Sequence, residues 1–123
     1  MLFTLKNEKI TLSVDSLGAQ MMSLLSSDGT EYLWQGEAEY WSDRAPNLFP
    51  FIRRLTNNSY KYNGIVYPMG IHGFAAAMEF EAVHQSENSV TLELSSSLIT
   101  LAQYPFDFCF RIRYCLRENP RWM

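Results

Sequence analysis

Residues 106–117, FDFCFRIRYCLR, carry the clearest structural signal in this chain of 123 residues. Two kinds of side chain alternate along the stretch, which is the period-two pattern of a β-strand with one buried face. One face would carry Phe108, Phe110, Ile112, Tyr114 and Leu116. The other would carry Cys109, Arg111, Arg113, Cys115 and Arg117. The alternation therefore predicts a strand that turns a largely aromatic face to the core.

The same alternation recurs outward from this strand. KITLSVD (9–15) places Ile10, Leu12 and Val14 on one face, and SVTLELS (89–95) does the same with Val90, Leu92 and Leu94. Asp28-Gly29 and Asn63-Gly64 each lie between apolar runs, and both pairs tolerate the positive φ of a tight hairpin turn. No segment shows a helical period over more than two turns. The sequence predicts one all-β domain over residues 1–123, of the sandwich type.

The composition narrows the classes of partner. The formal net charge is -3 and the hydrophobic share is 47%. An acidic chain is a poor match for nucleic acid or an anionic membrane, and no apolar run approaches the roughly 20 residues of a membrane helix. The N-terminus, MLFTLKNEKITLSVD, becomes charged too early for a secretory signal. We expect a cytoplasmic protein.

The two cysteines are predicted to be reduced. Cys109 and Cys115 would lie about 20 Å apart on one strand, and a disulfide needs Cα atoms within about 7 Å. Their spacing does not suggest metal ligands either.

Two irregular stretches interrupt the strand pattern, and such segments on a β scaffold tend to carry binding residues. The first is EYWSDRAPNLFPFIRRL, residues 39–55. Its arginines and aromatic rings would suit a sugar, which accepts hydrogen bonds at its hydroxyls and stacks its C–H faces on rings. The residues concerned are Arg44, Arg53, Arg54, Trp41, Phe49 and Phe51. Alternatively, the arginines are surface residues whose stems cover apolar groups.

The second irregular stretch is YPMGIHGFAAAMEF, residues 67–80, where His72 lies between Gly70 and Gly73. The glycines permit backbone conformations that other residues resist and allow a ligand to come close. From residue types alone, a ligand-binding His and a purely structural turn remain equally open. His84 is expected to be exposed to solvent, and Asp107 to begin a strand. No nucleophile elbow, phosphate loop or metal-binding helix is present.

These segments, taken in order, resemble the aldose 1-epimerase (galactose mutarotase-like) family, especially its LacX-type branch. The matching runs are LGAQMMSLLSSDGTEYLWQG, YWSDRAPNLFPFIRRL, YPMGIHGFAAAMEFE and YPFDFCFRIRYCL. The resemblance implies an antiparallel β-sandwich of the supersandwich type, of which this chain would be the N-terminal part. It also implies cofactor-free interconversion of the α and β anomers of a free hexose. In that chemistry a carboxylate base removes the anomeric hydroxyl proton while a His protonates the ring oxygen.

The resemblance also implies roles for individual residues. Arg54 matches the sugar-holding arginine of the segment Pro-x-x-x-Arg-Leu, and His72 matches a His that contacts the sugar near its ring oxygen. Phe74 continues the His-Gly-Phe motif as part of the binding site. Relatives follow that motif with Ala-Arg, whereas this chain reads Ala75-Ala76. Arg44 is then a candidate to compensate in substrate binding, together with Arg53, which stands where relatives commonly have Gly.

The departure from the family lies in length. The second His motif and the base Glu would follow residue 123, and neither Glu93 nor Glu118 lies in a matching context. We therefore expect a truncated chain whose isomerase activity is impaired. The alternative is a non-catalytic carbohydrate-binding or vestigial domain. In either case, exposed strand edges predict self-association into a homo-oligomer.

Overall fold

The computed structural model describes residues 1–36 and 44–117. It contains eight strands: β1 (Leu2–Lys6), β2 (Ile10–Asp15), β3 (Gln20–Ser26), β4 (Ser59–Tyr62), β5 (Ile65–Pro68), β6 (Glu81–Gln85), β7 (Ser89–Ser95) and β8 (Cys109–Cys115). Within these ranges, helical structure is limited to three short segments: η1 (Thr56–Asn58), η2 (Ala75–Ala77) and α1 (Leu98–Leu101). None of the helices in the described ranges is long and apolar enough to cross a membrane.

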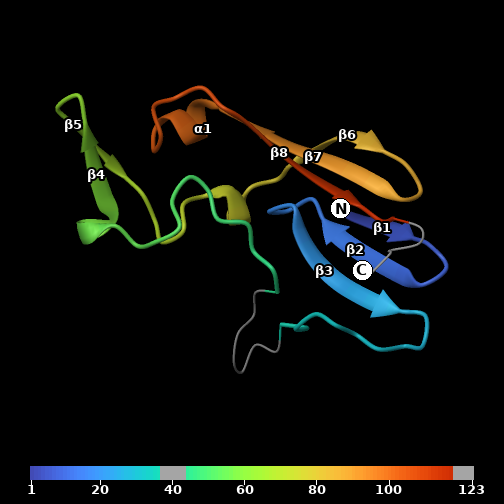
Figure 1. The fold of residues 1–123 in the computed structure, drawn as a ribbon. Coiled ribbons are helices and arrows are strands. Elements are labelled where there is room, and N and C mark those ends of the chain that lie inside the picture. Colours follow the sequence, from blue (N-terminus) through green and yellow to red (C-terminus); the bar gives the residue numbers. More distant parts are fainter. Residues whose placement is uncertain (37–43, 118–123) are drawn as a thin grey trace, which may run out of the picture.

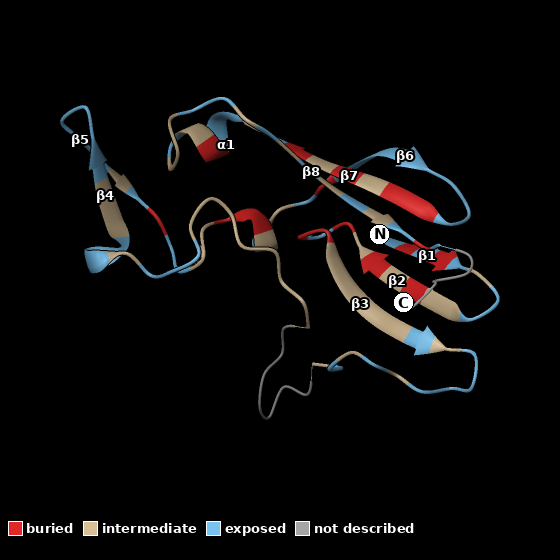
Figure 2. Cartoon of the chain, in the orientation of Figure 1, coloured by how far each residue is buried: buried red, intermediate tan, exposed pale blue. Residues whose placement is uncertain are grey.

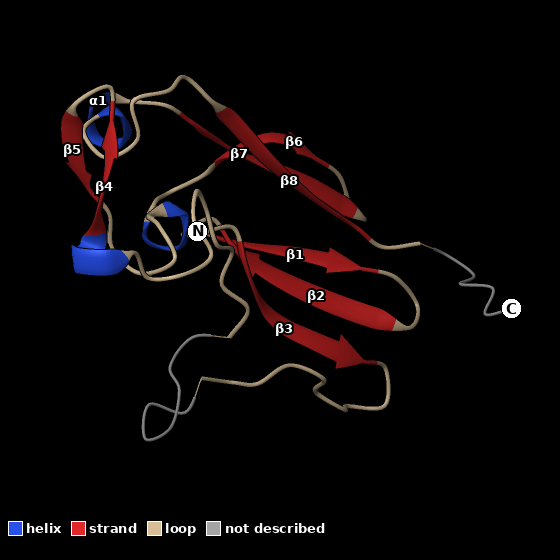
Figure 3. Cartoon of the chain, turned by 60° about the vertical axis from the view of Figure 1, so that its left-hand side comes forward, coloured by secondary structure: helices blue, strands red, loops and turns tan. Residues whose placement is uncertain are grey.

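The strands form three antiparallel sheets, ordered β1-β2-β3, β4-β5 and β6-β7-β8. The two larger sheets lie next to each other, and the β4–β5 hairpin projects at the opposite end, near α1 (Figures 1 and 3). The hydroxyl of Tyr60 in β4 donates a hydrogen bond to the carbonyl of Gln103, just after α1, which fixes the hairpin to that end. The antiparallel all-β prediction is confirmed.

The core lies between the two larger sheets, and its buried residues come mainly from β1, β2 and β7 (Figure 2). In β7 the predicted inward residues Val90, Leu92 and Leu94 are all buried. In β8 the exposed and half-buried positions alternate as predicted, with Phe110, Ile112 and Tyr114 against the core. Both free cysteines lie at the ends of this strand and are exposed, which confirms that they do not pair with each other.

The two predicted hairpin turns have different outcomes. Asn63 and Gly64 have φ values of 49° and 78° and connect β4 to β5, as expected for this pair. Asp28-Gly29 also forms a turn, but the run that follows it is not a strand, and it adds only an isolated bridge between Leu25 and Glu31. The reason is the Glu31 carboxylate, which accepts hydrogen bonds from the backbone N–H groups of Leu24 and Leu33. A carboxylate that binds these donors competes with regular strand pairing.

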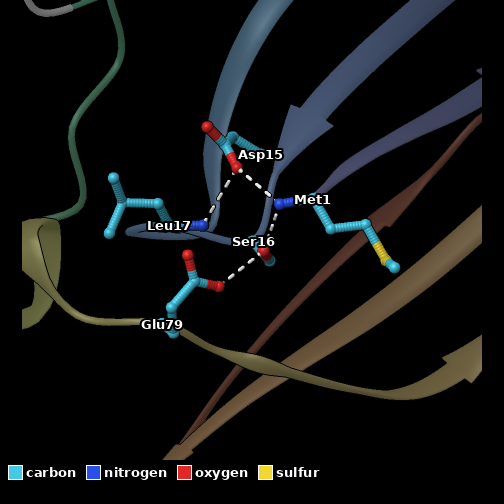
Figure 4. A network of polar contacts seen from close by, with 5 residues as sticks. All are labelled: Met1, Asp15, Ser16, Leu17 and Glu79. Carbon is cyan, nitrogen blue, oxygen red and sulfur yellow. Dashed lines mark hydrogen bonds and ion pairs between the residues drawn. The ribbon is translucent and has the colours of Figure 1, made fainter.

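A polar network joins the first residue to the turn after β2 (Figure 4). The Met1 ammonium contacts Asp15 Oδ1 at 3.4 Å and donates to Ser16 Oγ at 3.0 Å. Ser16 is buried, and its hydroxyl donates to Glu79 Oε2 at 2.7 Å. These bonds satisfy a buried hydroxyl and connect the β1-β2-β3 sheet to the segment that enters β6.

Candidate functional site

The His72 turn is built against the backbone of a segment far away in the sequence. His72 and Gly73 both have positive φ, 62° and 78°. Gly73 forms an isolated parallel bridge with Phe49. The carbonyl of Phe49 then accepts two backbone hydrogen bonds, from Phe74 at 2.9 Å and from Ala75 at 3.2 Å. These bonds attach the residues that follow His72 to the backbone of Phe49.

Gly73 is required by this close approach. A Cβ atom on Gly73 would lie 2.2 Å from the carbonyl oxygen of Phe49 and 2.6 Å from the nitrogen of Pro50. No side chain fits at such distances, and the positive φ independently favours glycine. A Cβ on Gly70, at the start of the same turn, would meet nothing within 4 Å.

The imidazole of His72 lies against the same segment. Its Nδ1 is in hydrogen-bond contact with the carbonyl oxygen of Ile52, and the residue is half-buried. Arg53 and Arg54 follow directly in the chain and are exposed, and neither forms a hydrogen bond or ion pair with another described residue. The structure therefore brings His72 to the segment that carries Arg54, and it leaves that guanidinium available.

An aromatic cluster supports the turn from below. The Phe49 ring contacts Phe74, Phe108 and Phe110, with centroids 6.1, 5.0 and 4.7 Å away. Phe74, a predicted binding residue, is only 7% exposed and belongs to the core. Phe51 packs edge-on against Tyr60 at 5.3 Å. In these positions Phe49 and Phe51 are packing residues that hold the arginine segment.

Arg44 is engaged elsewhere. Its Nη1 donates to the Met22 carbonyl at 2.8 Å and to Gln35 Oε1 at 3.2 Å. Its backbone N–H donates to Gln20 Oε1 at 2.8 Å. Within the described residues no hydrogen bond or ion pair joins Arg44 to the His72 turn. Trp41, predicted in the same stretch, lies outside the described residues.

The carboxylate of Glu93 is held by an arginine on the outer face of the β6-β7-β8 sheet. Arg111 Nε donates to Glu93 Oε2 at 2.6 Å, and this bond is the main reason that the pKa of Glu93 lies below its ordinary value of 4.5. A carboxylate with a lowered pKa is a weak proton acceptor, which makes Glu93 unsuited to be a general base. Glu118 lies outside the described residues.

Replacing Arg111 with glutamine is expected to raise the pKa of Glu93 toward 4.5. Since the folded pKa is below the unfolded one, the ion pair stabilises the fold above the ordinary Glu range and loses that effect as the pH falls through the folded pKa. The R111Q variant should lack this pH-dependent contribution to the free energy of unfolding. Carboxyl NMR titration measures the pKa, and Arg113→Gln, on the same face of β8, is the control. An unchanged Glu93 titration in R111Q would show that the bond is not formed in solution.

Other titratable groups and cavities lie apart from the His72 turn. His84 is exposed on β6, as predicted. A depression of about 500 Å³ is lined by Lys6, Asn7, Glu8, Ser86, Glu87 and Asn88, at the β1–β2 and β6–β7 turns. Among the described residues no group of three or more His, Cys, Asp or Glu side chains is arranged to hold a metal ion. The backbone carbonyls of Phe49 and Ile52 were not foreseen as parts of the site, because a backbone group has no residue-type signature.

Comparison with known proteins identifies relatives of the chain. The sequence profile of the aldose 1-epimerase family matches residues 1–122. The plasmid and chromosomal LacX proteins of Lactococcus lactis subsp. lactis are each 38% identical to the chain over 121 residues, which is 94% of this chain and 40% of the relative. The chain thus spans about 40% of the length of these relatives.

Solved structures give the same result. A galactose mutarotase related enzyme from Lactobacillus acidophilus matches with a TM-score of 0.93 and 37% identity, over 95% of this chain and 39% of its own. A galactose mutarotase-like protein from Lactobacillus casei matches with a TM-score of 0.92 and 31% identity, over 96% of this chain and 40% of its own. The fold is therefore part of a galactose mutarotase-like fold. With a family profile that covers nearly every residue, the chain belongs to the aldose 1-epimerase family.

Proposed function

We propose that Arg54 and His72 bind a free aldose, and that the reaction they serve is the interconversion of its α and β anomers. The observation that carries the proposal is the contact between the His72 ring and the segment of Arg54, through Ile52. A guanidinium with no partner among the described residues, and an imidazole in contact with the segment that carries it, offer several hydrogen-bond donors to sugar oxygens. In this proposal Phe74 supports the turn, and Arg44 is bonded to Met22 in β3.

The chemistry needs an acid and a base. Removal of the proton from the anomeric hydroxyl and protonation of the ring oxygen open the ring, and rotation followed by closure gives the other anomer. His72 is the proposed acid. The proposed base is a carboxylate other than Glu93, whose side chain is bound to Arg111. General acids and bases each contribute about 10²–10⁴-fold in rate, so removal of either group should slow the reaction by about that factor.

Polarimetry tests this directly. Freshly dissolved α-glucose or α-galactose is followed with the chain and with its H72A variant, which controls for catalysis by general protein surface. A rate above the spontaneous one that falls in H72A supports the reaction. The reaction is rejected if the chain and a protein of the relatives' full length that contains it both leave the rotation rate unchanged.

A second candidate is carbohydrate binding without catalysis, combined with self-association. It is favoured by β8, which pairs with β7 alone among the described strands and leaves one edge open. Sedimentation at the concentration of the sugar assay gives a dimer or larger species if this edge is used, and a monomer if it is not.

The exposed, unpaired cysteines fit the reducing cytoplasm, where we place the protein.

A further inference from the structure

The contact between His72 and Ile52 determines which ring nitrogen can face a ligand. Nδ1 of His72 lies against the backbone carbonyl oxygen of Ile52. A carbonyl oxygen only accepts hydrogen bonds, so the nitrogen that faces it must carry the hydrogen. We propose that the Ile52 carbonyl is a positioning group that holds neutral His72 in its Nδ1-protonated form and leaves Nε2 as the nitrogen that meets the ligand.

Other backbone hydrogen bonds lie close to both sides of this contact. On the turn, Gly73 N–H donates to the Gly70 carbonyl at 3.1 Å, which closes the backbone around His72. On the other side, the Phe49 carbonyl accepts the N–H groups of Phe74 and Ala75. The Phe49 ring is in turn surrounded by other aromatic rings. The hydrogen bonds to Phe49 join the turn to the chain three residues before Ile52, and so keep the imidazole close to that carbonyl.

The assigned tautomer has a consequence for the ligand atom that His72 contacts. In the neutral ring Nε2 carries a lone pair, so it accepts a hydrogen bond from a sugar hydroxyl but cannot donate one to a ring oxygen. In the protonated ring Nε2 donates, and the ring oxygen becomes a suitable partner. Binding and proton delivery would then use the same atom. This assignment of the ligand atom rests on the proposed function, whereas the tautomer itself does not.

The charged residues that follow Ile52 on the contacting segment are Arg53 and Arg54. The carboxylates in the described part of the chain form no hydrogen bond or ion pair with His72. The Nδ1 hydrogen is therefore assigned by the backbone carbonyl rather than by an acidic partner, as in a His–Asp pair. Side-chain substitutions at position 52 should leave the tautomer unchanged.

Long-range ¹H–¹⁵N correlation NMR on the ¹⁵N-histidine-labelled chain tests the proposal, at a pH where both imidazoles are neutral. The second histidine, His84, is exposed and has no side-chain hydrogen bond to a described residue, so it serves as the internal reference. A free imidazole side chain in water favours the Nε2-protonated form. We expect His84 to show that form and His72 to show a pyrrole-type Nδ1 with a pyridine-type Nε2. The same Nε2-protonated pattern for both residues would overturn the proposal.

Three variants test whether the carbonyl or a side chain sets the tautomer. His84→Gln assigns the signals. Ile52→Ala retains the carbonyl and removes an exposed side chain, and Arg54→Gln retains the backbone and removes the guanidinium. Both should keep the Nδ1-protonated pattern of His72, and its loss in either would show that a side chain, not the carbonyl, sets the tautomer.

Adding galactose or glucose to the labelled chain separates the two claims. If both hold, the Nε2 signal of His72 moves with sugar while Nδ1 stays pyrrole-type. If His72 is Nδ1-protonated and its signals do not move with sugar, the positioning role is supported and the result counts against the proposed function. If His72 is Nε2-protonated and its signals move with sugar, the result supports the proposed function and overturns the positioning role.

Discussion

Replacing Gly73 with alanine is expected to lower the free energy of unfolding by about 2–5 kcal/mol. The backbone conformation contributes about 1–2 kcal/mol of this, because Gly73 has a φ of 78° that L residues with a Cβ resist. Overpacking contributes about 1–3 kcal/mol more, since the new Cβ would lie 2.2 Å from a backbone oxygen that cannot move alone. That oxygen, on Phe49, already accepts two hydrogen bonds. Small domains are stable by only about 5–15 kcal/mol, so G73A should be strongly destabilised.

Gly70→Ala is the matched control. It lies in the same turn, its φ is not positive, and a Cβ there has open space. Its effect should stay within about 0.5 kcal/mol. Urea unfolding of both variants, followed by tryptophan fluorescence, gives the two midpoints. Equal midpoints for G73A and G70A would mean that the turn is not pressed against Phe49 in solution.

The strands were predictable where the alternation is long enough to show a buried face. β7 and β8 are of this kind, because every second side chain packs on the same core. β1 was not predicted, although Phe3 and Leu5 are buried, because its alternation is short and runs directly into the charged residues of the turn. The strand predicted after Asp28-Gly29 was wrong for a different reason. The carboxylate of Glu31 folds back onto backbone donors, and that competition has no periodic signature.

The candidate site was predictable in its residue types and not in its connections. The His-Gly-Phe and Arg-Leu segments could be singled out from the sequence, and the structure brings His72 to the segment of Arg54. The attachment depends on backbone carbonyls at Phe49 and Ile52, which any residue would supply. The role of Arg44 could not be predicted either. Its partner is the carbonyl of Met22, whose position follows only from the folded sheet.

Arg54→Ala is expected to reduce hexose affinity by about 10- to 150-fold, the equivalent of a charge-assisted hydrogen bond worth about 1.5–3 kcal/mol. His72→Ala is expected to reduce it by about 2- to 13-fold, the equivalent of a neutral hydrogen bond worth about 0.5–1.5 kcal/mol. Arg54→Ala removes a guanidinium that is exposed and forms no hydrogen bond or ion pair with a described residue, so the loss falls on ligand contacts and not on the fold. His72→Ala removes the imidazole and leaves the backbone bonds of the turn in place. Titration calorimetry with galactose and glucose measures both. Arg113→Ala and His84→Ala, which alter exposed residues on β8 and β6, should bind as the parent chain does.

The double variant R54A/H72A decides whether the two residues act on one ligand. Both lie on or against one short segment, so a single hexose should contact both, and removal of either should loosen the hold of the other. The combined loss in binding free energy should then be smaller than the sum of the single losses, as for residues that share a partner. Strictly additive losses would indicate separate sites. Unchanged affinity in H72A, with a urea midpoint equal to that of the parent chain, would remove His72 from the binding site altogether.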